Sequence, residues 1–329
     1  MVRNKQVDGL RGITILLILI FHIYYRYGEL FMNKSMEVIN LGTFGITIFL
    51  LISSYFLNNE RKRNLQKFFV SKIKRLWPCY AASITITWGV LHLFELPGRM
   101  TTVYDYFANL VYINGFLGMP YVDGAHWYIT TLLAAIWLTG VITYFGVGKF
   151  PITYFVLFFF EGLSNVFGFN ILNRILGSSY IGLICLGICI RKLKVQNYSC
   201  SELFRFENAR MYVKRNQWLL TAVGCVIYYV TRKGIAMMLC LCITLPIFLG
   251  AIYNKFSVLD KKIPQHFGRI SYPLYLVHQN ISYTIIYHLS KINGDYVWLW
   301  KIVAFIGVII LGEVMFFVVE QPIQKFINK

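Results

Sequence analysis

The chain has 329 residues, of which 57% are hydrophobic and only 14% are charged, and its mean hydropathy is +0.58. Soluble domains carry about 25% charged residues, so this composition excludes an ordinary soluble domain and indicates a helical membrane protein. The basic residues behind the net charge of +18 gather in a few loops, which is typical of membrane topology and not of nucleic-acid binding.

Long apolar stretches recur along the whole chain and predict about ten transmembrane helices. The predicted spans are residues 10–29, 40–57, 78–96, 127–147, 150–169, 174–190, 217–230, 234–253, 269–289 and 297–319. The stretch 104–120 is apolar but contains Asn109, Asn114, glycines and a proline. This composition favours a re-entrant or interfacial segment over a further span.

The distribution of charge orients the predicted helices. An N-terminus in the cytoplasm places most of the 32 lysines and arginines on the cytoplasmic side, chiefly in the loops 61–75 and 191–216. We therefore predict an all-α, multi-pass protein of the cell membrane, with both termini cytoplasmic and one transmembrane domain over residues 1–329. Most of the seven cysteines fall in apolar runs, which favours buried core thiols over disulfides or a metal site.

The first span contains two ionisable residues, Arg11 and His22. A charged group at hydrocarbon depth costs roughly 2.5 kcal/mol or more, so such residues are candidates for a functional site. Their spacing is about three helical turns, which places both on one helix face roughly 16 Å apart, with Asp8 extending the polar stripe. We expect Arg11 at the membrane surface to attract an anionic molecule and a neutral His22 to act as a general base. The alternative is that His22 only packs against a neighbouring helix.

The basic loop that precedes the third span ends in Lys74, Arg75 and Trp77. Anchoring by positive charge explains most of the loop. Arg75 differs because it lies at the mouth of the helix, and arginine binds phosphate bidentately and stacks on planar rings. Arg11 and Arg75 are predicted on the same membrane side, where together they could hold a phosphorylated cytosolic co-substrate.

His126 and Trp127 open the fourth span from the outer side. An interfacial tryptophan is common in membrane proteins and needs no functional explanation. His126 lies close to Asp123, and we expect it to contact an external polar substrate.

The ninth span places Ser271 and His278 seven residues apart, and hence on one helix face. Pro273 is expected in the first turn of this helix, where proline is tolerated. His278 should reach a depth similar to that of His22, since both helices enter from the cytoplasm. Packing alone is again the alternative explanation for this histidine.

Other chemistry is limited in this sequence. Glu161 and Glu313 lie within spans, so each is expected to face the protein interior and to be protonated or paired. There is no Gly-Xaa-Ser-Xaa-Gly elbow, no phosphate-binding Walker loop and no His/Cys cluster with metal-ligand spacing. We expect no metal ion.

Five segments of the chain resemble, in order, motifs of membrane acyltransferase family 3. They are DGLRGITILLILIFH (8–22), KRLWPCY (74–80), HWYITTLL (126–133), RISYPLYLVH (269–278) and VVEQPIQKF (318–326). The first and fourth segments are the most specific, and the resemblance extends over essentially the whole chain.

The resemblance implies ten or so helices, cytoplasmic termini and transfer of an acyl group from cytosolic acyl-CoA to an acceptor, often a sugar. By matching position, Arg11 and His22 would form the catalytic motif and Arg75 would contact the acyl donor. Many members continue after the tryptophan with an acidic pair, whereas Leu132 occupies the first acidic position here. The chain therefore resembles a branch without that carboxylate and without a fused extracellular domain.

These observations predict an integral-membrane O-acyltransferase, specifically an O-acetyltransferase, that uses acetyl-CoA or another acyl-CoA as co-substrate. Its acceptor would be a hydroxyl of a cell-surface or lipid-linked polysaccharide. The expected catalytic residues are His22, Arg11 and His278; the expected donor-binding residues are Arg75, Arg11, Lys74 and Trp77; and the expected acceptor-binding residues are His126, Trp127 and Ser271.

Two alternatives belong to other functional classes. A transporter of polysaccharide or lipid-linked sugar would share the many spans and the buried polar residues, although the chain has no evident internal repeat. A non-catalytic membrane scaffold is disfavoured by the stripe of Arg11 and His22. Turnover of acyl-CoA separates an acyltransferase from both.

Overall fold

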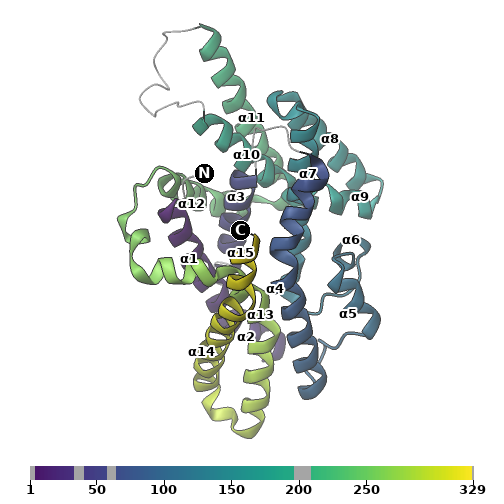
Figure 1. The fold of residues 1–329 in the computed structure, drawn as a ribbon, viewed down its shortest axis with the longest axis vertical. Coiled ribbons are helices and arrows are strands. Elements are labelled where there is room, and N and C mark those ends of the chain that lie inside the picture. The colour runs from purple at the N-terminus through teal and green to yellow at the C-terminus, as the bar shows by residue number, and fades with distance from the viewer. Residues whose placement is uncertain (1–3, 33–40, 58–63, 196–208, 328–329) are drawn as a thin grey trace. The chain divides into compact units, whose positions relative to one another are not determined.

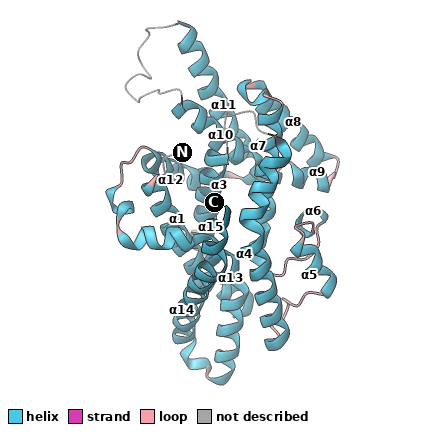
Figure 2. Cartoon of the chain, in the orientation of Figure 1, coloured by secondary structure: helices cyan, strands magenta, loops and turns pink. Residues whose placement is uncertain are grey.

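The computed structural model of the chain describes residues 4–32, 41–57, 64–195 and 209–327 (Figure 1). Within these ranges all regular structure is helical and there is no strand, in agreement with the predicted all-α class (Figure 2). The main helices are α1 (Lys5–Ile20), α2 (Tyr27–Phe31), α3 (Leu41–Leu57), α4 (Leu65–Phe94), α5 (Val103–Leu110), α6 (Asn114–Leu117), α7 (Trp127–Tyr144), α8 (Ile152–Val166), α9 (Asn170–Ile175), α10 (Ile181–Val195), α11 (Ala209–Lys233), α12 (Ile235–Ile252), α13 (Lys262–Ile292), α14 (Val297–Met315) and α15 (Gln321–Ile327).

Each predicted span overlaps a helix of the structure. Five helical segments among the described residues are long and apolar enough to cross a membrane: Lys5–Phe31, Gly124–Tyr144, Asn170–Lys194, Ile235–Ile252 and Gly294–Ile327. Leu41–Leu57 and Ile152–Val166 are apolar but shorter. The chain is therefore a helical membrane protein, while ten crossings and cytoplasmic termini stay predictions.

The helix that contains the predicted ninth span, α13, begins before residue 269, where the span was predicted to start. α13 starts at Lys262, so Pro273 lies well inside the helix, and our expectation that it sits in the first turn is wrong. Pro264 is the proline in the first turn, where a missing backbone N–H costs no helical hydrogen bond. Residues 262–268 were not predicted as part of this span because Lys262, Gln265 and His266 are polar and precede the apolar run.

The segment 104–120 contains two short helices, α5 and α6. The eight residues of α5 extend about 12 Å, far less than the thickness of a membrane core of about 30 Å. The buried Asn109 holds the segment together, because its Nδ2 donates to the carbonyls of Asp105 (2.7 Å) and Pro120 (2.9 Å) and its Oδ1 accepts from the Val122 N–H (3.2 Å). This geometry agrees with a segment that does not span.

The chain divides into two compact units, each assembled from separate stretches. The first unit comprises Met1–Ile46, Lys72–Tyr128 and Pro246–Lys329, and the second comprises Thr47–Ser71 and Ile129–Leu245. The prediction of one transmembrane domain over residues 1–329 stays a prediction. Among the described cysteines all are free thiols, and all except Cys242 are buried, as expected for core residues.

In the first unit, α1 packs against α13 and the turn before it through glycines. A Cβ atom added at Gly9 would lie 2.0 Å from the Leu259 carbonyl oxygen, and one at Gly12 would lie 2.0 Å from that of Pro264. Across the same contact, a Cβ at Gly268 would lie 2.0 Å from the Asp8 carbonyl oxygen. Since no side chain fits at these distances, the glycines allow the two backbones to touch.

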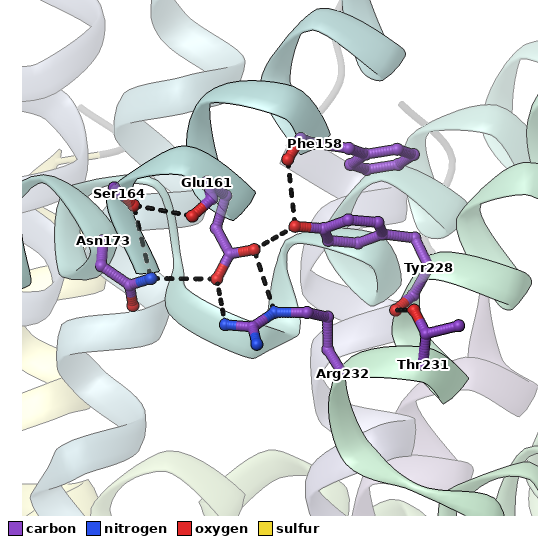
Figure 3. A network of polar contacts seen from close by, with 7 residues as sticks. All are labelled: Phe158, Glu161, Ser164, Asn173, Tyr228, Thr231 and Arg232. Atoms are coloured by element: carbon purple, nitrogen blue, oxygen red, sulfur yellow. Dashed lines mark hydrogen bonds and ion pairs between the residues drawn. The ribbon is translucent and has the colours of Figure 1, made fainter. Parts of the chain in front are cut away.

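The second unit contains a buried ion pair, shown in Figure 3. Glu161 of α8 is fully buried, and Arg232 of α11 donates to both of its carboxylate oxygens at 2.8 and 3.2 Å. Asn173 of α9 donates to the same carboxylate at 3.0 Å, and the Tyr228 hydroxyl also donates to it. Glu161 is thus paired, as expected, and ties three helices together. Glu313, in the first unit, forms an ion pair with His266.

The glycine contact generates a stability prediction. We expect Gly12→Ala to destabilise the protein by about 1–3 kcal/mol, because the added methyl group overlaps the backbone of α13. Gly89→Ala in α4 is the matched control, since nothing lies within 4 Å of its added Cβ. Alanine should be neutral or slightly stabilising there. Thermal unfolding of detergent-solubilised protein measures both effects, and equal melting temperatures for the two variants would contradict the prediction.

Candidate functional site

The first candidate residue, His22, lies where the first helix widens. A π-helical turn, Phe21–Arg26, follows α1 without a break and contains His22. Such turns arise when one extra residue is accommodated in a helix, and they are frequent at functional sites. Because α1 is regular up to Ile20, the spacing between Arg11 and His22 keeps both on one helix face, as the sequence predicts.

His22 meets two buried ring side chains of α13. Its Nδ1 lies 3.0 Å from the Tyr283 hydroxyl, and its ring centroid lies 4.9 Å from that of His278 in an edge-on arrangement. Tyr283 and His278 are fully buried, whereas His22 is partly exposed. The structure thus brings together two of the predicted catalytic residues and adds Tyr283, which the sequence analysis did not identify.

The hydrogen bonds of His278 define which of its nitrogens carries a proton. Nδ1 lies 2.6 Å from the Tyr275 carbonyl oxygen, which can only accept, so Nδ1 carries the hydrogen. In the neutral ring Nε2 is then an acceptor. This atom is buried and has no hydrogen-bond partner among the described residues. A buried unpaired acceptor costs about 1–3 kcal/mol, so its presence calls for a functional explanation.

Nearer the start of α1, Arg11 lies within electrostatic range of a buried carboxylate that Arg75 also influences. Both guanidinium groups act electrostatically on Glu320, which lies buried in a second π-helical turn, Phe316–Glu320. Arg11 also contacts Asp8, with 3.3 Å between Nη1 and Oδ1. The sequence predicted only that the two arginines share a membrane side. Glu320 belongs to the VVEQPIQKF segment, but the sequence analysis gave it no role.

The other donor-binding candidates flank Arg75 at the start of the first unit's part of α4. Lys74 and Arg75 are exposed, and Trp77 is 44% exposed. The Trp77 indole N–H donates to the Leu110 carbonyl at 2.8 Å, which fixes its ring against α5. Contact of these residues with an acyl donor stays a prediction.

Asp123 and His126 hold two backbone groups of α13. The Asp123 carboxylate accepts from the N–H groups of Asn280 (3.0 Å) and Ala125 (2.8 Å), and His126 Nε2 donates to the Leu276 carbonyl (2.9 Å). Leu276 C=O and Asn280 N–H are four residues apart, about one helical turn. Asp123 and His126 therefore form hydrogen bonds to both ends of this turn, and we call this pair of contacts the clamp. This clamp fixes the part of α13 that carries His278.

The three acceptor-binding candidates differ in accessibility. His126 is fully buried, and its Nδ1 has no partner among the described residues. Ser271 is also buried, and its hydroxyl donates to the Gly268 carbonyl at 2.9 Å. Trp127, at the start of α7, is partly exposed. The geometry gives His126 a structural part in the clamp, and acceptor contact by all three stays a prediction.

The clamp generates a second stability prediction. We expect Asp123→Asn to destabilise the protein by about 1–3 kcal/mol, because the amide turns an NH2 group towards one of the two backbone N–H donors and leaves it unpaired. Asp295→Asn is the control, since Asp295 is exposed. Thermal unfolding checks this result, and a wild-type melting temperature for Asp123→Asn would show that the clamp contributes no stability.

Comparison with known proteins identifies the family of this chain. A family model described as an acyltransferase domain matches residues 4–318. No curated protein and no solved structure matches the chain. The family match includes the α1 motif, the Arg75 segment and the α13 motif, and it covers both compact units. Since it extends over nearly the whole chain, the chain belongs to membrane acyltransferase family 3.

Proposed function

We propose that this acyltransferase is an O-acyltransferase that moves an acyl group from cytosolic acyl-CoA to a hydroxyl of a cell-surface or lipid-linked polysaccharide. Acetyl-CoA is the expected donor, and the cell membrane is the expected location. The observation that carries the proposal is the group formed by His22 with Tyr283 and His278 of α13. His22 itself follows α1, the helix of Arg11, without a break. A base and a cation at two ends of one helix suit a long, anionic co-substrate.

Arg75 and Arg11 are the proposed contacts for the CoA phosphates. Arg75 is exposed and makes no hydrogen bond or ion pair with the described residues, so its guanidinium group is available to a phosphate. Charge-assisted, bidentate hydrogen bonds make arginine the side chain best suited to this task. Glu320 would add a negative charge near both arginines, although it forms no ion pair with either within the described residues.

His22 is the proposed general base. When Nδ1–H donates to the Tyr283 oxygen, Nε2 keeps its lone pair and can take the proton of the acceptor hydroxyl. The acceptor oxygen then attacks the thioester carbonyl carbon, and the C–S bond breaks. The CoA thiolate that leaves takes the proton back from His22, so the imidazole returns to its starting state.

His278 is proposed to share or orient a proton beside the primary base. Its unpaired Nε2 is a second buried acceptor next to the His22 ring. On the acceptor side, the partly exposed Trp127 is proposed to pack against a sugar ring. His126 and Ser271, which are buried, are the other two proposed acceptor contacts.

The role of His22 generates an activity prediction. In purified, bilayer-reconstituted protein, His22→Ala should lower acyl transfer by about 10²–10⁴-fold, since this is the usual contribution of a general base. His278→Ala should cost less, and His278→Gln should recover part of the loss because an amide still forms hydrogen bonds. Acyl-CoA consumption and product formation are measured together, with melting temperature as the control for folding.

The outcomes of these measurements separate the possible explanations. Near wild-type turnover in a folded His22→Ala variant would reject His22 as the base. Wild-type protein that neither hydrolyses nor transfers from acyl-CoA would reject the proposed function and favour a transporter. Mass spectrometry of surface polysaccharide from deletion and complemented strains would identify the acylated sugar.

The role of Arg75 generates a separate prediction. Arg75→Ala should raise the KM for acyl-CoA by about one to two decades, the equivalent of one charge-assisted hydrogen bond. Lys67→Ala is the matched control, because Lys67 is an exposed cation on the same helix about two turns earlier. Equal changes in both variants would mean that the region supplies only diffuse positive potential.

A further inference from the structure

Arg99 is a cation near His22 without a counter-ion among the residues that the structure describes. It lies between α4 and α5, is partly buried, and its side chain forms no hydrogen bond or ion pair with any described residue. Its guanidinium carbon lies 6.0 Å from the ring centroid of Tyr283, and its charge acts on His22. The other cation at this end of the site, Arg26, is paired with Glu29.

A second polar side chain beside Arg99 also lacks a partner. Gln279 follows His278 on α13 and is only 5% exposed, yet its amide forms no hydrogen bond with the described residues. A Cβ atom added at Gly124 would lie 2.5 Å from Gln279 Nε2 and 3.2 Å from Arg99 Nη1. Both side chains therefore pack against the backbone of Gly124, and these two nitrogens lie no more than 5.7 Å from each other.

Two unpaired donors in one place indicate a ligand of opposite polarity. Gln279 and Arg99 each keep a donor group that no described residue accepts from, and one anion in this place could accept from both. A guanidinium group and an amide N–H are matched donors for a carboxylate or a phosphate. In the predicted orientation this point faces the outer side, where the acceptor is expected to enter.

We propose that Arg99, together with Gln279, binds an anionic group of the acceptor, so that the substrate is a carbohydrate bearing a carboxylate or a phosphate. This inference rests on the proposed function, since it specifies the acceptor of the same site. Arg99 would hold the anion beside Tyr283 and thereby place a neighbouring hydroxyl near His22. Neutral sugars would lack this contact.

Calorimetric titration of the full-length protein in nanodiscs tests the proposal with three probes. Methyl glucuronide carries a carboxylate, glucose 1-phosphate carries a phosphate, and methyl glucoside is neutral. We expect the anionic sugars to bind more tightly than the neutral one. Arg99→Gln should weaken their binding by about tenfold to a hundredfold, the usual effect of losing a charge-assisted hydrogen bond. The anion that loses more affinity identifies the source as a uronic acid or a sugar phosphate.

Arg26→Gln is the matched control, because it removes the same charge near His22 from a cation that already has a partner. It should weaken anion binding much less than Arg99→Gln. Arg99→Lys keeps the charge and should retain part of the binding, which separates recognition from misfolding. Equal binding of charged and neutral sugars, or equal effects of Arg99→Gln and Arg26→Gln, would overturn the proposal.

Failure of this inference and failure of the proposed function give different results. Anion binding that depends on Arg99 in a protein without acyl transfer would reject the proposed function. Acyl transfer from acyl-CoA without any preference for an anionic acceptor would reject the role of Arg99 and leave the proposed function intact.

Discussion

The contact between the backbones of α1 and α13 positions the rest of the candidate site. Packed helices usually lie 8–10 Å apart, and only small residues allow a closer approach. Gly9, Gly12 and Gly268 provide that approach, because a Cβ at any of them would overlap a carbonyl group of the opposite segment. With the two helices held so closely, His22 reaches the rings of His278 and Tyr283. The glycines that flank Arg11 in the first motif are therefore as important to the site as the charged residue itself.

The site is ordered by charge along the direction of α1. The charges of Arg11 and Arg75 both act on Glu320 at one end, and His22 lies about 16 Å further along the helix. CoA carries its phosphates far from its thioester, so this separation of cations and base matches its shape. Arg99, which has no counter-ion within the described part of the chain, lies beyond His22. Under the proposed function, the donor and the acceptor would therefore approach His22 from opposite ends of this arrangement.

Apolar periodicity and residue spacing in the sequence predicted the helices and which residues share a helix face. They did not predict contacts between segments that are far apart in the chain. Apolar periodicity located the helices, and the spacing of Arg11 and His22 indicated a shared face. The partnership of His22 with Tyr283 joins residues far apart in the chain and has no local signal. The hydrogen bond from the Asn280 N–H group to the Asp123 carboxylate likewise joins separate segments and had no local signal. The π-helical turn was also missed, because it depends on packing and not on composition.

The glycine contact also bears on how the protein is made. α1 leaves the ribosome early, while α13 follows only after most of the chain has been synthesised, and domains made in this way assemble in stages. Until α13 arrives, His22 has neither Tyr283 nor His278 beside it and must remain in the bilayer as an unsatisfied polar group. The catalytic group would thus be one of the last parts of the molecule to form, and a truncated nascent chain would hold the first motif without a working site.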